Sequence, residues 1–386
     1  MNLKKRTVSI ILTLLFIITA LVSCGSSEET GDRLSEDRDI SPEIEYESRM
    51  NLEYAQEFAV DKYSGGYALI SISDGSRFLV VPRDQEAPEN LDEDIIVLKQ
   101  PVDHIYMVAS AVMDMFRAID AMDAIRLSGT DTDGWYIEEA KEAMEAGRIL
   151  YAGKYSMPDY ELILSEGCRL AIENMMLTHT PEVQEKLEGF DIPVLIDRSS
   201  YESHPLGRME WVKLYGVLMG KEDAAEAAFK AQTEALEEIS NQENTGKTVA
   251  FFYLTANGSV NVRESSDYVP KMIELAGGKY IFENLGDEES KASSMNMQIE
   301  EFYAGAKDAD YLIYNSTVDR EIASVDELLA KSDLLKDFKA VKEGHVWCTT
   351  NNFYQESMSL GTFIMDVHTI LTESKAADTE YMYLLK

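Results

Sequence analysis

Seven aromatic and arginine side chains stand where a large planar or anionic molecule could be held. Aromatic rings provide flat apolar walls, and a guanidinium provides a rigid fork of donors for carboxylate or phenolate oxygens. Each follows a run that predicts a strand or lies in the next loop: Trp135, Tyr136, Arg198, Tyr201, Arg263, Phe353 and Tyr354. A partly buried ring or a surface ion pair explains each one alone equally well. As a set, we expect three or four of them to line a cleft.

The five histidines do not predict a site for a free metal ion. Zinc or manganese would need three or four ligands that converge, typically histidines with carboxylates. His104, His345 and His368 lie at or before strands or on a helix, away from such loops. His179 and His204 do lie in loops after predicted strands, so either could contact iron that a chelator or porphyrin already holds. A histidine without any such role remains the simpler alternative.

Catalytic motifs are absent from the sequence. Gly246-Lys247-Thr248 resembles the end of a phosphate loop, but Asn241 stands where the first glycine is required, and the segment enters a strand instead of opening a helix. There is no GxSxG or HExxH, and no GxGxxG follows the first strand of the predicted parallel sheet. The sequence therefore predicts a binding protein and not an enzyme, with no cofactor of its own.

Hydrophobic periodicity predicts the elements that position these residues. Alternating residues around Asp74-Gly75 predict a β-hairpin within 58–81. From Ile105 onward, short apolar runs alternate with helical patterns, which predicts a parallel sheet with helices on both faces. The predicted strands are 105–109, 125–128, 149–152, 170–172 and 194–197, and the predicted helices are 113–122, 137–146, 159–166 and 181–187.

A helical pattern over 210–242, interrupted only by Gly216 and Gly220, separates this half from a second α/β half. The second half has predicted strands at 248–254, 280–282, 311–315 and 345–349, and predicted helices at 268–276, 298–307, 325–341 and 353–371. We therefore expect an α/β fold of two Rossmann-like lobes with central parallel sheets, 51–209 and 243–386. A single long helix, 210–242, joins them, and a ligand cleft lies between them.

The first 23 residues predict a signal peptide. Three early positive charges precede an apolar core over 8–22, which is shorter than the roughly 20 residues that span a bilayer. The segment Leu21-Val22-Ser23-Cys24 resembles a bacterial lipobox, which implies cleavage before Cys24 and lipidation of its sulfur. An ordinary signal peptide or an uncleaved anchor is the alternative. Residues 24–50 are polar and acidic, which predicts a flexible tether.

The acidic balance excludes one class of partner. The net charge of −35 becomes −38 after loss of the three positive charges of the signal peptide, and nucleic-acid binding depends on lysines and arginines that neutralise phosphates. Besides Cys24, only Cys168 and Cys348 remain. Both lie at predicted strands, which favours two free thiols over a disulfide.

Several longer segments resemble the substrate-binding lipoproteins of ABC importers for ferric siderophores, cobalamin and haem. They are "QPVDHIYMVASAVMDMFRAIDAMDAIRLSG", "AGKYSMPDYELILSEGCRLAIEN", "MIELAGGKYIFENLG", "ADYLIYN" and "VKEGHVWCT". The "ELAGG" within the third is the most specific, and the resemblance covers roughly 55–375. It implies two lobes bridged by a rigid helix, a ligand in the cleft between them, and only modest closure.

In that family, each lobe presents a glutamate to arginines on the permease. The resemblance places the N-lobe glutamate at Glu161 and the C-lobe glutamate at Glu300 or Glu301, of which Glu300 is preferred. An acidic residue in the first turn of a helix also complements the helix dipole, so this role is an implication of the resemblance only.

Together these observations predict a monomeric, lipid-anchored protein on the extracytoplasmic face of a bacterial membrane. It would capture an iron chelate (siderophore), haem or corrinoid and deliver it to an ABC-importer permease dimer with its cytoplasmic ATPase. A sensory or scaffolding module on the same fold, not coupled to import, is the alternative. The sequence does not specify the ligand, since this fold is shared by binders of all these molecules.

Overall fold

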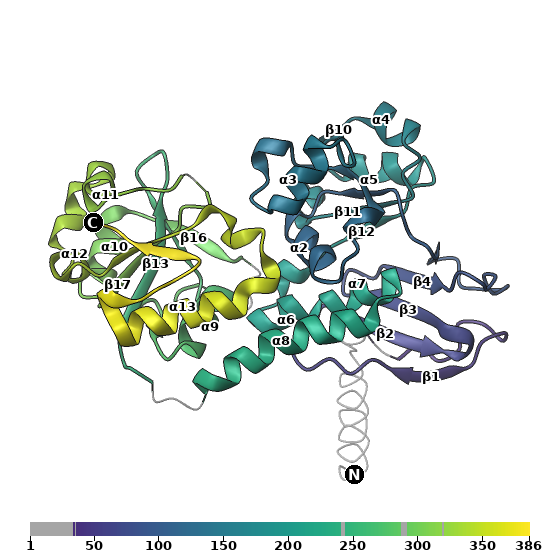
Figure 1. Cartoon of the computed structure of the whole chain (residues 1–386), viewed down its shortest axis with the longest axis horizontal. Coiled ribbons are helices and arrows are strands. Elements are labelled where there is room, and N and C mark those ends of the chain that lie inside the picture. The colour runs from purple at the N-terminus through teal and green to yellow at the C-terminus, as the bar shows by residue number, and fades with distance from the viewer. Residues whose placement is uncertain (1–33, 35, 241–243, 287–291, 319) are drawn as a thin grey trace, which may run out of the picture.

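The computed structural model describes residues 34, 36–240, 244–286, 292–318 and 320–386 (Figure 1). The predicted signal peptide and Cys24 lie outside the described residues. Within those ranges, no helix is both long enough and apolar enough to cross a bilayer.

An N-terminal sheet of five strands precedes the two lobes. Its strands, in spatial order, are β1 (Tyr46–Arg49), β2 (Phe58–Tyr63), β3 (Tyr67–Ile72), β4 (Arg77–Val81) and β5 (Ile95–Lys99). The predicted hairpin is confirmed as β3 and β4, which pair antiparallel around Asp74 and Gly75. Pairing of β1 with β2 and of β4 with β5 then makes a separate sheet, which the hairpin pattern alone did not predict.

The prediction that residues 24–50 form a flexible tether is wrong from residue 36 onward. Ile40 and Ile44 are buried against one face of the N-terminal sheet, and the segment continues into β1. The Arg49 guanidinium also pairs with the buried Asp61 carboxylate at 2.8 Å. A few apolar residues in an acidic stretch are thus sufficient to order it, because the sheet provides an apolar face to cover.

The N lobe contains the predicted parallel sheet. Its strands, in spatial order, are β12 (Val194–Ile196), β11 (Leu170–Glu173), β6 (Ile105–Met107), β7 (Ile125–Ser128) and β8 (Leu150–Tyr151). Four helices follow the predicted positions within a few residues: α2 (Ser110–Ala118), α3 (Glu138–Glu145), α4 (Tyr160–Ser165) and α5 (Pro181–Glu188). A short hairpin of β9 (Gly153–Lys154) and β10 (Met157–Pro158) precedes α4.

The connection between the lobes is not one continuous helix. It consists of α6 (Pro205–Glu210), α7 (Val212–Met219) and α8 (Glu222–Ser240), which we call the hinge. Gly220 ends α7 in a left-handed conformation (φ 66°), which glycine adopts without strain. Only α8 matches the predicted long helix, and Figure 1 shows it running from the N-terminal sheet towards the C lobe, beside α13.

The C lobe has a mixed sheet where a parallel one was expected. The strands are β13 (Thr248–Leu254), β14 (Val260–Arg263), β15 (Lys279–Tyr280), β16 (Ser294–Met297), β17 (Tyr311–Tyr314), β18 (Val346–Thr349) and β19 (Met382–Leu384). β13, β15, β17 and β18 are parallel, whereas β14, β16 and β19 run antiparallel to their neighbours.

The C-lobe helices are α9 (Tyr268–Leu275), α10 (Ile299–Ala306), α11 (Val325–Lys331), α12 (Lys339–Glu343) and α13 (Leu360–Glu373). The helix predicted over 325–341 is divided between α11 and α12 by a 3-10 turn over 333–337. The helix predicted over 353–371 begins later, at Leu360. Cys168 and Cys348 are free thiols, as predicted.

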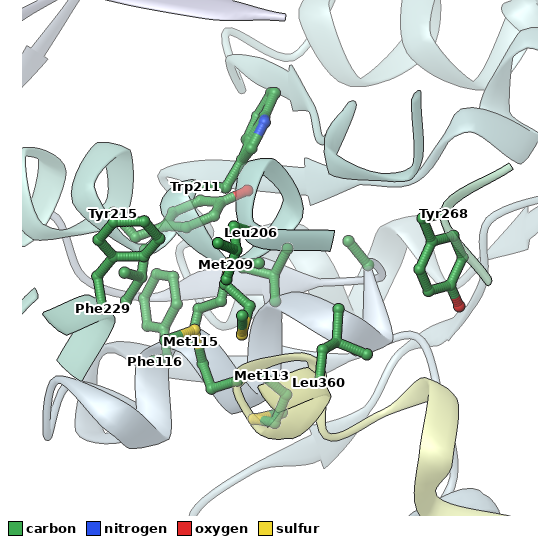
Figure 2. Close-up of a cluster of buried hydrophobic side chains, with 14 of the residues drawn as sticks. Met113, Met115, Phe116, Leu206, Met209, Trp211, Tyr215, Phe229, Tyr268 and Leu360 are labelled. Carbon is green, nitrogen blue, oxygen red and sulfur yellow. The ribbon is translucent and has the colours of Figure 1, made fainter. Parts of the chain in front are cut away.

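One hydrophobic core extends through the hinge into both lobes. Figure 2 shows its central part, where Met113 of α2 and Leu360 of α13 approach each other beneath the hinge side chains Leu206 and Met209. The same cluster continues into the N-terminal sheet at Phe58. Because close-packed interiors resist displacement, this shared core limits how far the lobes can separate.

Candidate functional site

The lobes are fastened together along one edge of their boundary. The Gln355 side chain donates from Nε2 to the Gly134 carbonyl and accepts from the Tyr136 backbone N–H, both at 2.7 Å. Nearby, the Met358 backbone N–H donates to the buried Asp114 carboxylate at 2.7 Å. These bonds join the loop after β18 to the loop after β7 and to α2.

The opposite edge of the boundary is hollow. A pocket of about 180 Å³ lies between the loop after β12, which includes Tyr201, and the loop after β14, which includes Asp267. It shares Ser203 and Ser266 with a larger pocket of about 540 Å³ that extends towards the hinge. We call these two pockets the inter-lobe groove. On the N-lobe side the groove lies at the carboxyl end of the parallel strand β12, which is where open α/β sheets bind ligands. On the C-lobe side it lies at the amino ends of the parallel strands, because β14 runs antiparallel to β13.

On the N-lobe side, Arg198 follows β12 and stacks on Tyr201, with its guanidinium carbon 4.6 Å from the ring centroid. Its Nε donates to the Ser73 hydroxyl at 2.7 Å and to the Glu57 carboxylate at 3.1 Å. Both partners belong to or border the N-terminal sheet, so this sheet reaches the edge of the groove.

On the C-lobe side, Arg263 ends β14 and donates a short hydrogen bond to the Tyr354 hydroxyl. The Asn315 side chain donates to the same hydroxyl at 3.0 Å. Three strand ends of the C lobe, those of β14, β17 and β18, thus converge on one phenol. Arg263 also lies 3.8 Å from the Asp267 carboxylate.

A third arginine, Arg208 of α6, packs its guanidinium 4.0 Å from the ring centroid of Tyr268, which lines the groove. Within the described part of the chain, its guanidinium has no ion pair or hydrogen bond. Burial raises the pKa of Asp267, and the positive charges of Arg263 and Arg208 partly counteract that rise. The positive charges of both guanidinium groups therefore act on one carboxylate at the groove wall.

His204 caps α6 at the hinge end of the groove. Its Nδ1 accepts from the Leu206 backbone N–H at 3.2 Å, and its ring stacks on Tyr54 with centroids 4.8 Å apart. Burial, with a further contribution from Lys271, lowers the pKa of this imidazole. Among the described residues, no group of three or more His, Cys, Asp or Glu side chains is placed to hold a metal ion.

The predicted binding residues thus divide into three groups. Tyr201 and His204 line the groove. Arg198 and Arg263 do not line it but contact Glu57 and Asp267, which do, and Tyr354 accepts a hydrogen bond from Arg263. Tyr136 is half exposed at the fastened edge, where its backbone bonds Gln355. Trp135 and Phe353 correct the expectation, because their rings are buried in the hydrophobic core and present almost no surface to a ligand.

Two contributors to the site were not predicted. Arg208 lies near the end of the segment that follows the predicted strand 194–197. The same criterion that selected Arg198, an arginine after a strand, could have included it. Glu57 offered no such clue, because it reaches Arg198 across 141 positions of sequence. Sequence periodicity does not predict which distant loops meet.

The predicted docking glutamates are all exposed. Glu161 lies in the first turn of α4, and Glu300 and Glu301 lie in the first turn of α10. None of the three has an ion pair with a described residue. Around α4, Met157 and Leu164 are also exposed, at 71% and 45% of their surface.

Comparisons with known proteins agree with this architecture. Residues 170–352 match the family model for periplasmic binding proteins. An uncharacterized lipoprotein of Methanocaldococcus jannaschii is 26% identical over 93% of this chain and 91% of its own length.

Among solved structures, the periplasmic haem-binding protein HutB of Vibrio cholerae has a TM-score of 0.56 at 15% identity, covering 70% of this chain and 99% of its own. The catecholate-siderophore binding protein VctP of Vibrio cholerae has a TM-score of 0.55 at 14% identity, covering 70% and 94%. The predicted resemblance and the α/β fold are therefore confirmed. The matched family model and both named structures describe binding proteins and not enzymes, as expected.

Proposed function

We propose that this chain, which has the fold of the periplasmic binding proteins, captures an iron chelate (siderophore), haem or corrinoid and delivers it to an ABC-importer permease. The observation that carries this proposal is the placement of Arg198, Arg208 and Arg263 around the inter-lobe groove of a protein with a net charge of −35. Arg198 pairs with Glu57, and Arg263 lies 3.8 Å from Asp267, so Arg208 is the arginine that most favours a ligand with an anionic group.

The aromatic side chains at the same edge suit a large ligand with flat surfaces. Tyr201 lines the groove, and Tyr354 lies next to Arg263. Solved structures with this fold include a haem-binding protein and a catecholate-siderophore binding protein, which supports this class of ligand.

Delivery would use the exposed glutamates of the two lobes. Glu161 on α4 and Glu300 or Glu301 on α10 are exposed, so each lobe could present one glutamate to an arginine of a permease. The relatives named as lipoproteins support an anchor at Cys24, which would keep the protein on the extracytoplasmic face of the membrane beside its permease and ATPase. The proposed working unit is a monomer.

The binding part of the proposal is tested by titrating residues 25–386 with ferric siderophores, haem and cobalamin. A ligand at about 100 times its dissociation constant should stabilise the protein by about 2.7 kcal/mol. Arg208→Ala should weaken binding of an anionic member about tenfold, because a charge-assisted hydrogen bond would be lost. Arg148→Ala, which removes an exposed arginine of the N lobe, is the control. If no member of the panel binds, the proposed ligand class is wrong.

The delivery part is tested by replacing Glu161 and Glu300 together with alanine. Uptake of the bound ligand by cells should fall sharply while its affinity for the isolated protein stays unchanged. Glu142→Ala with Glu145→Ala removes two exposed acids of α3 as a control. Unchanged uptake in a further variant that also lacks Glu301 would favour a sensory or scaffolding role.

A further inference from the structure

We infer that the N-terminal sheet forms a third wall of the ligand site, in which Glu57 and Ser73 position Arg198 and Glu57 disfavours ligands of high negative charge. This inference rests on the proposed function, because it concerns the same groove. Glu57 itself lines the smaller pocket of the groove.

The contact between this wall and Arg198 is closely built. Arg198 Nε is 2.7 Å from the Ser73 hydroxyl and 3.1 Å from the Glu57 carboxylate. Ser73 also donates a short hydrogen bond to the same carboxylate, and its backbone N–H donates to the Glu57 carbonyl at 2.9 Å. The Arg198 and Glu57 side chains are only 11% and 17% exposed, so water screens their charges poorly. The Ser73 and Glu57 side chains together thus fix the position of the Arg198 guanidinium.

Two buried carboxylates hold the wall in place. Residues 53–57, which we call the strap, connect β1 to β2 and cross the hinge. The Glu210 carboxylate accepts the backbone N–H groups of Glu53, Tyr54 and Ala55 at 2.8–3.1 Å. The Glu202 carboxylate accepts those of Gln56 and Glu57 at 2.9–3.0 Å. The backbone of Glu57 is anchored in this way, and hydrogen bonds from Ser73 and Arg198 hold its carboxylate.

The comparisons differ in how much of this chain they cover. Those structures match about seven tenths of this chain although nearly all of their own length is covered. Residues 105–386, from β6 to the C-terminus, make up a similar share (282 of 386 residues). The archaeal lipoprotein, in contrast, aligns over 93% of this chain. The two-lobe fold from β6 to the C-terminus would by itself make up a share of that size.

The wall changes the charge that a ligand meets. Glu57 neutralises Arg198, whereas Arg208 has no ion pair within the described chain. An anionic group should therefore bind on the side of Arg208, and the side of Glu57 should favour a neutral or donor group. A chelate with several negative charges would have one of them close to Glu57, where like charges repel.

The experiment compares two ferric chelates of different charge, a trianionic tris-catecholate and a neutral tris-hydroxamate. Glu57→Gln keeps the shape of the side chain, removes its charge and leaves Arg198 uncompensated. It should raise the affinity for the tris-catecholate about tenfold relative to the tris-hydroxamate. The matched control is Glu53→Gln, which removes an exposed acid from the same strap.

A second variant separates position from charge. Ser73→Ala removes one hydrogen bond to Arg198 without changing any charge, so it should weaken both chelates alike, by a few-fold. An unchanged ratio of affinities in Glu57→Gln, with binding intact, would overturn this inference and leave the proposed function standing. If no variant binds either chelate, haem or cobalamin, the proposed function fails, and the inference fails with it.

Discussion

Two regions of this molecule bury glutamates with opposite results. At the hinge, Glu210 is fully buried, and its carboxylate receives three backbone N–H groups of the strap and lies 3.2 Å from Lys213 Nζ. At the end of β11, Glu173 is equally buried, but neither of its carboxylate oxygens has a hydrogen-bond partner in the described chain. Burial raises the pKa of Glu173 to about 8.

The difference shows that burial alone does not decide what a carboxyl group contributes. An ionised carboxylate is stable inside a protein when donors replace its water, as they do at Glu210. Glu173 has no donors, so it remains protonated at neutral pH and reduces stability. The first glutamate fastens the N-terminal sheet to the hinge, and the second is a cost to the N lobe.

The largest expected effect is at Glu210. Glu210→Ala should lower the free energy of unfolding by about 3–4 kcal/mol, because three backbone donors and Lys213 would lose their buried acceptor. Urea denaturation measures this change. The control is Glu226→Ala, since Glu226 contacts the same lysine at 3.1 Å but is 63% exposed. A loss no larger than in this control would mean that the carboxylate does not fasten the strap.

At Glu173, a substitution is expected to increase the free energy of unfolding. Between about pH 4.5 and 8 the folded protein keeps this proton and the unfolded chain has lost it, so the free energy of unfolding falls as pH rises through that window. Glu173→Gln removes this dependence and should stabilise the protein by about 4 kcal/mol near pH 7.5 and very little near pH 4.5. Unfolding experiments at both pH values, with the exposed Glu182→Gln as control, measure the difference. If the stability gain of Glu173→Gln did not depend on pH, the raised pKa of the Glu173 carboxyl would be contradicted.

The smallest expected change in the free energy of unfolding is at His204. Its neutral ring accepts a single capping hydrogen bond, from the Leu206 backbone N–H. The pKa of this histidine is lowered in the folded state, so its contribution is present above about pH 6.5 and is lost as pH falls. His204→Ala should cost about 1 kcal/mol near pH 7.5 and less near pH 5. His204→Asn, which also has a capping side chain, should recover most of that loss. Equal losses in both variants would argue against the cap.

The sequence predicted the elements that depend on local pattern. Asp74-Gly75 defines the β3–β4 hairpin, and the repeat of strand and helix from Ile105 defines the N-lobe sheet. Features that depend on tertiary pairing were missed: Ile40 and Ile44 pack on an apolar face of the N-terminal sheet, and β1 pairs with β2. The break at Gly220 was also missed, since a glycine within a helical pattern is often tolerated.

The site follows the same division. Loop position and residue type were sufficient to predict that Arg198, Tyr201, Arg263 and Tyr354 lie at or near the boundary between the lobes. They were not sufficient to place the ring of Trp135, because an aromatic residue beside a strand can turn to the groove or to the core, and this one turns inward to donate to Ser128. Which partner an arginine finds, as with Glu57, depends on the tertiary fold alone.

The continuous core through the hinge has a consequence for how the chain can be divided. Met113 and Leu360 come from different lobes yet belong to one cluster. A fragment that stops after α8, or one that starts at β13, would expose this surface to water and should aggregate or stay unfolded. The two lobes together should therefore melt in a single cooperative transition, and only the paired halves would make a soluble product.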